Sequence, residues 1–72
     1  MHHDSEWDAG ELGCGELIFA LKMKVSALPG GHVLLLTARD AGAPAEIPAW
    51  CGMTGHALVA AEHPRYWIRR KD

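Results

Sequence analysis

The side chains best suited to covalent chemistry in this chain are its two cysteines, Cys14 and Cys51. They lie 37 positions apart, so they form neither a Cys-x-x-Cys redox pair nor a closely spaced pair of zinc ligands. Cys14 stands between two glycines in the stretch GCGEL, directly before an apolar run. It is either a thiol presented for chemistry or a small residue in a turn, and the residues alone leave both interpretations open.

The residues after Cys14 place it at the start of a helix. Apolar residues recur at intervals of three, four and three positions, and they are Ile18, Leu21, Val25 and Leu28. This spacing predicts a helix from Cys14 to about Leu28. The first N–H groups of a helix have no partner within it and favour negative charge. We therefore expect Cys14, as the N-cap, to be an accessible thiol with a depressed pKa.

The two residues after the cysteine, Gly15 and Glu16, are expected to belong to its site as supporting residues. Gly15 makes the helix start less rigid, but it adds an N–H that could point at the sulfur. Glu16 suits the first turn of a helix, yet its charge opposes formation of the thiolate. The sequence does not decide which effect is larger.

Cys51 follows Trp50 on the apolar face of a second predicted helix, which runs from Pro44 to about Thr54. A cysteine in such a position is commonly a small buried hydrophobe, so we expect Cys51 to be packed in the core. A disulfide between Cys14 and Cys51 stays open, because the sequence does not give their separation.

Strand patterns surround the two predicted helices. A short strand is expected around Trp7, and the continuous apolar run 32–38 predicts a buried central strand. Residues 57–61 and 65–69 predict an antiparallel hairpin, with Tyr66 and Trp67 on opposite faces. The order β-α-β-α-β-β predicts an α/β two-layer sandwich, with two helices on one face of a four-stranded mixed sheet.

Length and composition narrow the classes of function. One domain is expected over residues 1–72, with residues 1–5 as a flexible lead-in. A hydrophobic content of 49% indicates a globular chain, and its small size favours surface chemistry or partner binding over a deep pocket. The formal charge of −2 makes nucleic acid an unlikely partner, although the stretch RYWIRRK is basic. Without an apolar span or a signal peptide, we expect no membrane association and a cytoplasmic location, where cysteines stay reduced.

Three stretches of the chain, WDAGELGC, PGGHVLLLTARDAGAPAEIPAWCGMTGHALV and RYWIRRK, together cover roughly residues 6–71. They resemble, in that order, the opening, the middle and the final strand of the TusA/SirA family of sulfur carriers. The family has a βαβαββ fold and transfers sulfur as a persulfide on the cysteine of a Cys-Pro-x-Pro motif. The resemblance places that cysteine at Cys14, but here the motif is Cys-Gly-Glu-Leu and both prolines are missing. Asp40 matches the aspartate that follows the second strand in the family.

The resemblance implies a small sulfur carrier, or sulfurtransferase, that takes sulfane sulfur from a donor protein and passes it to an acceptor protein. It implies no cofactor, and no metal-ligand spacing is present. Asp40 is expected to cap the second helix or to hold a loop beside Cys14. A protein-interaction or regulatory module that has lost the chemistry is the alternative that the missing prolines favour. An RNA-binding module is a further alternative, supported by the basic tail and opposed by the net charge.

Overall fold

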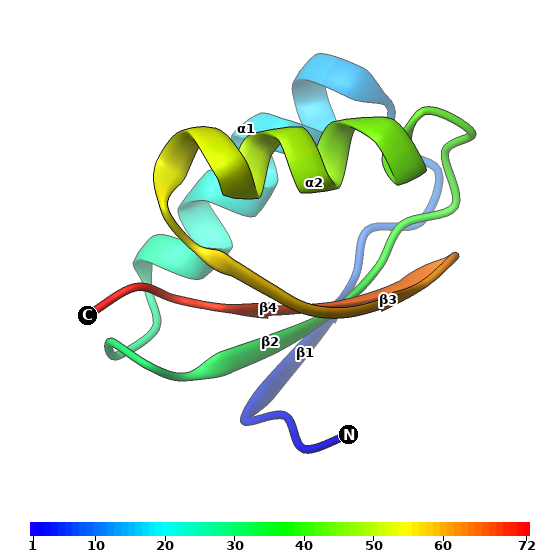
Figure 1. Cartoon of the computed structure of the whole chain (residues 1–72). Coiled ribbons are helices and arrows are strands. Elements are labelled where there is room, and N and C mark those ends of the chain that lie inside the picture. The colour runs from blue at the N-terminus through cyan, green and yellow to red at the C-terminus, as the bar shows by residue number, and fades with distance from the viewer.

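The computed structural model describes all 72 residues, and it contains four strands and two helices. In chain order the elements are β1 (Ser5–Asp8), α1 (Cys14–Ser26), β2 (Val33–Thr37), α2 (Ala43–Thr54), β3 (Ala57–Glu62) and β4 (Arg65–Arg69). Figure 1 shows both helices on one face of a single sheet, which leaves the other face without a helix. The predicted βαβαββ two-layer sandwich is confirmed. Neither helix is long and apolar enough to cross a membrane.

The direction of the strands decides where the helices begin. The sheet has the order β1-β2-β4-β3, in which β1 is parallel to β2 and β4 is antiparallel to both of its neighbours. Strands β2 and β3 therefore point the same way, and each helix connects two strands of equal direction. Such a connection must return over the sheet before the next strand starts. Both helices consequently begin at the same end of the molecule, where β1 and β2 finish (Figure 1).

The buried face of α1 lies slightly to one side of the predicted stripe. The fully buried residues of this helix recur at four-residue spacing, and they are Leu17, Leu21 and Val25. Ile18 and Leu28 are only half-buried and pack at the margin of the core. The helix thus presents one narrow apolar face to the sheet, as a surface helix does.

The central strands supply the other half of the core. Leu34 and Leu36 of β2 face the helices and are at most 2% exposed, beside Tyr66 and Ile68 of β4. The intervening Leu35 lies on the face without helices and is half-buried. Residues 32–38 are therefore not buried throughout, because successive side chains of a strand point to opposite faces.

Tyr66 and Trp67 alternate across the sheet as predicted. Tyr66 is 1% exposed and lies in the core, whereas Trp67 is half-buried opposite Leu35 on the face without helices. This pairing gives the open face some apolar character.

The ends of the helices differ from the predicted bounds by one or two residues. Helix α1 ends at Ser26 instead of Leu28, because Pro29 disfavours helical geometry in the residue before it. Helix α2 begins at Ala43, so that Pro44 falls in its first turn, where a missing N–H costs no helical hydrogen bond.

The predicted lead-in reaches into the sheet at its last residues. Strand β1 begins at Ser5. The N–H of Asp4 donates to the carbonyl oxygen of Val33 at 2.9 Å, and a carboxylate oxygen of Asp4 accepts the N–H of Val33 at 2.9 Å. The flexibility predicted for residues 1–5 can therefore apply only before Asp4.

Truncation of the helix core should destabilise the protein strongly. We expect Leu21→Ala to lower the free energy of unfolding by about 2–5 kcal/mol, because Leu21 is fully buried between helix and sheet. Phe19→Ala is the matched control on the same helix, since Phe19 is 67% exposed, and it should change stability by no more than about 0.5 kcal/mol. Urea unfolding followed by circular dichroism measures both. Equal losses in the two variants would contradict the described orientation of α1.

Candidate functional site

Cys14 is the first residue of α1, and its side chain is exposed, as predicted. The N-cap is Gly13, whose backbone is extended, so Cys14 lies one position further into the helix than predicted. No side chain caps this helix start. Its free N–H groups are therefore available to stabilise negative charge nearby.

The sulfur of Cys14 contacts a carboxylate from the other helix. Its Sγ–H donates a hydrogen bond to Oε1 of Glu46, with 2.7 Å between the two heavy atoms. Glu46 belongs to the first turn of α2, 32 residues further along the chain. The two residues meet because both helices begin at the same end of the sheet.

This contact raises the pKa of the Cys14 thiol above that of an ordinary cysteine. The hydrogen bond to Glu46 is the largest cause, the negative charge of Glu46 is the next, and partial desolvation and the charge of Asp40 act in the same direction. The backbone N–H of Gly15 lowers the pKa, in the sense expected of a helix N-terminus. The predicted depressed pKa is therefore wrong, because a carboxylate in contact favours the protonated thiol more than the helix start disfavours it.

Glu16 does not have the effect that was predicted for it. Its side chain is exposed, and it is not among the groups that shift the pKa of Cys14. The carboxylate that opposes the thiolate is Glu46, which the sequence reasoning missed. No local pattern points to Glu46, although its place in the first turn of α2 could have suggested it once the strand directions were known.

Asp40 stabilises the turn before α2 without capping the helix. A carboxylate oxygen of Asp40 accepts the N–H of Gly42 at 2.9 Å, and its carbonyl oxygen accepts the N–H of Ala43 at 3.1 Å. Gly42 itself is the N-cap, so the predicted capping role is wrong. The carboxylate also lies beside the start of α1, because a Cβ added to Gly13 would stand 3.4 Å from its other oxygen. The second predicted role, a loop residue next to Cys14, describes Asp40 better.

Cys51 is packed in the core, as predicted. It is 4% exposed, and burial raises the pKa of its thiol to about 11. Both cysteines are free, so the disulfide that the sequence left open is absent. Cys14 is thus the one thiol that a partner could reach.

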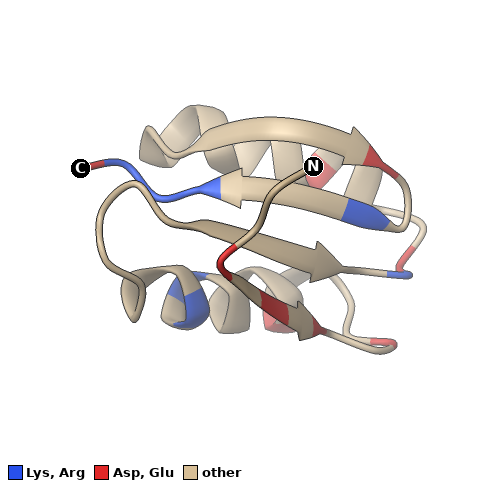
Figure 2. Cartoon of the chain, turned by 90° about the horizontal axis from the view of Figure 1, so that it is seen from below, with Lys and Arg blue, Asp and Glu red and all other residues tan.

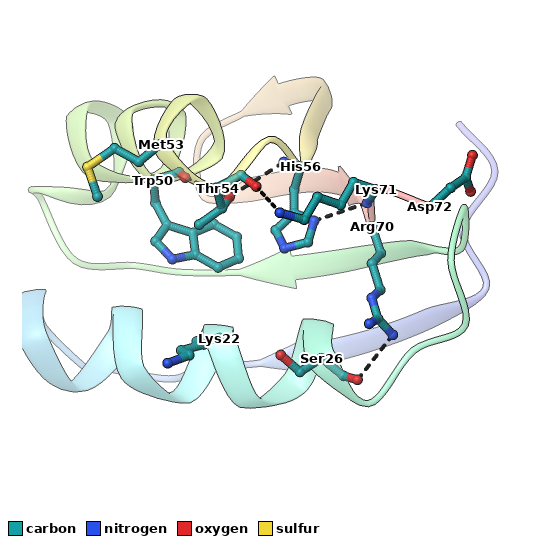
Figure 3. A pocket seen from close by; sticks show the side chains of 9 residues that line it. All are labelled: Lys22, Ser26, Trp50, Met53, Thr54, His56, Arg70, Lys71 and Asp72. Carbon is teal, nitrogen blue, oxygen red and sulfur yellow. Dashed lines mark hydrogen bonds between the residues drawn. The ribbon is translucent and has the colours of Figure 1, made fainter.

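A hollow of about 380 Å³ lies at the opposite end of the helices from Cys14. Figure 3 shows the residues that line it, which are Lys22, Ser26, Trp50, Met53, Thr54, His56, Arg70, Lys71 and Asp72. The hollow is not part of the thiol site.

At this end of the molecule, Arg70 and Lys71 of the basic tail bind backbone carbonyl oxygens. The guanidinium of Arg70 donates to the carbonyl oxygens of Ser26, at 3.2 Å, and of Leu28. The ammonium of Lys71 donates to the carbonyl oxygen of Thr54 at 2.6 Å. Cations at a helix C-terminus satisfy its last carbonyls and complement the helix dipole. These two cations therefore cap α1 and α2.

The two thiols should differ sharply in reactivity. We expect iodoacetamide to modify Cys14 alone in the native protein at neutral pH, and Cys51 only after unfolding, because Cys51 is buried. The alkylation rate of Cys14 should rise with pH, with a midpoint above that of a cysteine in an unstructured peptide, since its pKa is raised. Peptide mapping by mass spectrometry identifies the modified residue. A midpoint below that of the peptide would contradict the effect of Glu46.

The N–H of Gly15 should influence the thiol separately from the rigidity of the helix start. We expect Gly15→Ala to leave the pH midpoint of Cys14 alkylation unchanged, since the N–H is kept and a Cβ meets no atom within 4 Å. Gly15→Pro should raise the midpoint, because it removes the N–H that lowers the pKa. Both variants stiffen the backbone, so a shared shift would assign the effect to rigidity instead.

Comparison with known proteins places the chain in a family. No protein-family model matches it. The sulfur carrier protein TusA of Pseudomonas syringae pv. syringae (strain B728a) is 40% identical over 73 residues, which cover 96% of this chain and 87% of the relative. The sulfur carrier protein TusA of Pseudomonas entomophila (strain L48) is 36% identical over 73 residues, which cover 96% of this chain and 91% of the relative. Because this similarity extends over nearly the whole chain, the protein with the Cys14–Glu46 contact belongs to the TusA family of sulfur carrier proteins.

Proposed function

We propose that this chain is a small sulfur carrier that holds sulfane sulfur as a persulfide on Cys14. Membership of the TusA family supports the carrier role. The single observation that favours Cys14 as the carrying residue is that its thiol is exposed at the start of a helix, whereas the thiol of Cys51 is buried. An exposed sulfur can be reached by a second protein, and a buried one cannot.

The transfer needs only an exchange of sulfur between two cysteines. The Sγ of Cys14 attacks the outer sulfur of a persulfide on the donor protein, a new S–S bond forms, and the S–S bond of the donor breaks. The proton of Cys14 ends on the departing donor thiol, so that a persulfide and a thiol give a thiol and a persulfide. The oxidation states balance without an oxidant, and the step requires no cofactor.

The surface of the chain suits a protein partner better than a small substrate or nucleic acid. Cys14 lies outside the hollow, so the groups that orient the reacting sulfur must come partly from the sulfur donor or the sulfur acceptor. Arg70 and Lys71 of the basic tail are engaged with helix carbonyls, which leaves them less available for phosphates. A cytoplasmic location, where thiols remain reduced, fits two free cysteines.

A non-catalytic interaction module is the second candidate function. The raised pKa of Cys14 favours it, because little thiolate is present at neutral pH to act as the nucleophile. The absence of both motif prolines points the same way. The two functions differ in one measurable property, which is whether sulfur is gained on Cys14.

Sulfur loading should require Cys14 and not Cys51. After incubation with a sulfane-sulfur donor, we expect intact mass spectrometry to detect one added sulfur on the wild type and none on Cys14→Ser, which should remain folded because Cys14 is exposed. Cys51→Ser should still load, but it should lose stability because it buries a hydroxyl group.

The controls separate loss of chemistry from loss of fold. Circular dichroism and thermal unfolding of each variant establish that it is folded at the loading temperature. Equal sulfur gain on the wild type and on Cys14→Ser would exclude Cys14 as the carrier. No gain on a folded wild type with several donors would favour the interaction module.

A further inference from the structure

The surroundings of Cys14 are acidic. Glu46 contacts the sulfur directly, and Asp40 adds a second negative charge that acts on it. The cation nearest to Asp40 in the chain is Arg39, but its guanidinium donates to both carboxylate oxygens of Asp8, at 2.6 and 3.2 Å. Figure 2 shows most Asp and Glu toward the end of the molecule where the helices begin, and the cations of that end include Arg39 and Arg65, which pair with Asp8 and Glu62. The groups that act on the thiol through their charge are thus both carboxylates.

Glu46 has no cationic partner in this protein. Its Oε1 accepts the thiol proton of Cys14, and its Oε2 is buried without any hydrogen bond. The start of α2 offsets part of the negative charge, as any helix N-terminus does. A carboxylate with one unpaired oxygen still favours an additional donor or cation, and the Cys14–Glu46 hydrogen bond is exposed, so a second protein can bring one to Oε1. In the free chain the thiol proton of Cys14 is the one side-chain donor that Glu46 has.

We infer that Glu46 keeps the proton on Cys14 in the free chain, and that the sulfur donor releases it by bringing a cationic side chain to Glu46. This inference deepens the proposed function and rests on it. It identifies the chemistry of the donor: a persulfide sulfur with Lys or Arg beside it. A cation that pairs with Glu46 removes the hydrogen-bond acceptor and the negative charge that oppose the thiolate.

The proton has a defined route in this scheme. When the cation pairs with Glu46, the exposed thiol of Cys14 loses its proton to solvent water, and its Sγ attacks the outer sulfur of the donor persulfide. The donor S–S bond breaks, and the donor cysteine leaves as a thiolate that takes a proton back from the solvent. The loaded Cys14 persulfide then faces Glu46 and Asp40, whose charges disfavour its anion once the donor has left. This repulsion promotes transfer of the sulfur to the next protein.

Small disulfides of different charge test the inference on the free chain. Cystamine carries two ammonium groups, dithiodiglycolate carries two carboxylates, and bis(2-hydroxyethyl) disulfide is neutral. Each forms a mixed disulfide with Cys14 that intact mass and peptide mapping detect. Relative to an uncharged cysteine peptide, the wild type at low salt should favour cystamine over dithiodiglycolate by about tenfold or more. This preference should shrink in about 1 M salt, where charges are screened within about 3 Å.

Two charge-neutralising variants locate the source of this preference. Glu46→Gln should lower the ratio of the cystamine to the dithiodiglycolate rate at least about threefold, because it removes the charge in contact with the sulfur. It should also react faster than the wild type with the neutral disulfide at pH 7, since the thiol proton is no longer held. Glu16→Gln removes the same charge from the first turn of α1, and it should change either quantity by less than about twofold, because Glu16 does not act on the thiol.

The outcomes are distinguishable from those of the sulfur-loading experiment. Equal rate ratios in the wild type and in Glu46→Gln, or a slower neutral reaction in Glu46→Gln, would overturn the inference. A purely structural role of Glu46 would change unfolding without changing the charge preference, and would overturn it as well. A preference for cystamine in a protein that gains no sulfur would refute the proposed function and the inferred role of a cationic sulfur donor. It would still identify Glu46 as the group that holds the thiol proton.

Discussion

Both helices begin at one end of the sheet because each connects two strands that run in the same direction. This constraint brings together residues that the sequence keeps far apart: Cys14 at the start of α1 and Glu46 in the first turn of α2, which are 32 positions from each other. If either pair of strands were antiparallel, a short turn could join them, and no helix would have to begin at this end of the sheet. The thiol site is therefore a consequence of strand pairing, in which β2 lies between β1 and β4 and buries Leu34 and Leu36 against the helices.

Two opposing influences meet at the sulfur of Cys14. The helix start offers N–H groups that favour a thiolate, and the N–H of Gly15 lowers the pKa accordingly. Glu46 offers an acceptor and a full negative charge in direct contact, and it raises the pKa. A full charge at hydrogen-bond distance outweighs the partial charge of a helix terminus, which is about half a unit. The position of a cysteine in a helix is thus insufficient to establish its reactivity.

The sequence was informative where structure follows from local spacing and uninformative where it follows from contact between distant residues. The order of elements, the burial of Cys51 and the exposure of Cys14 could be predicted, because apolar periodicity and turn residues define which face of each element is covered. The pKa of Cys14 could not be predicted, because it depends on Glu46. The effect predicted for the charge of Glu16 on the thiolate was wrong for the same reason, because nearness in sequence does not bring its carboxylate to the sulfur.

A protonated Cys14 is compatible with a sulfur carrier as well as with the non-catalytic interaction module. A sulfur carrier must avoid reacting with every electrophile it meets, and an exposed thiolate would not do so. Holding the proton on Cys14 through Glu46 lowers the reactivity of the free thiol, and in the inferred scheme the sulfur stays at the surface for a protein that neutralises the carboxylate. In a Cys-Pro motif the residue after the cysteine carries no N–H, whereas Gly15 supplies one that acts against Glu46. The glycine at position 15 therefore restores part of the thiolate stability that the carboxylate removes, which offsets part of the argument that the missing prolines make for the interaction module.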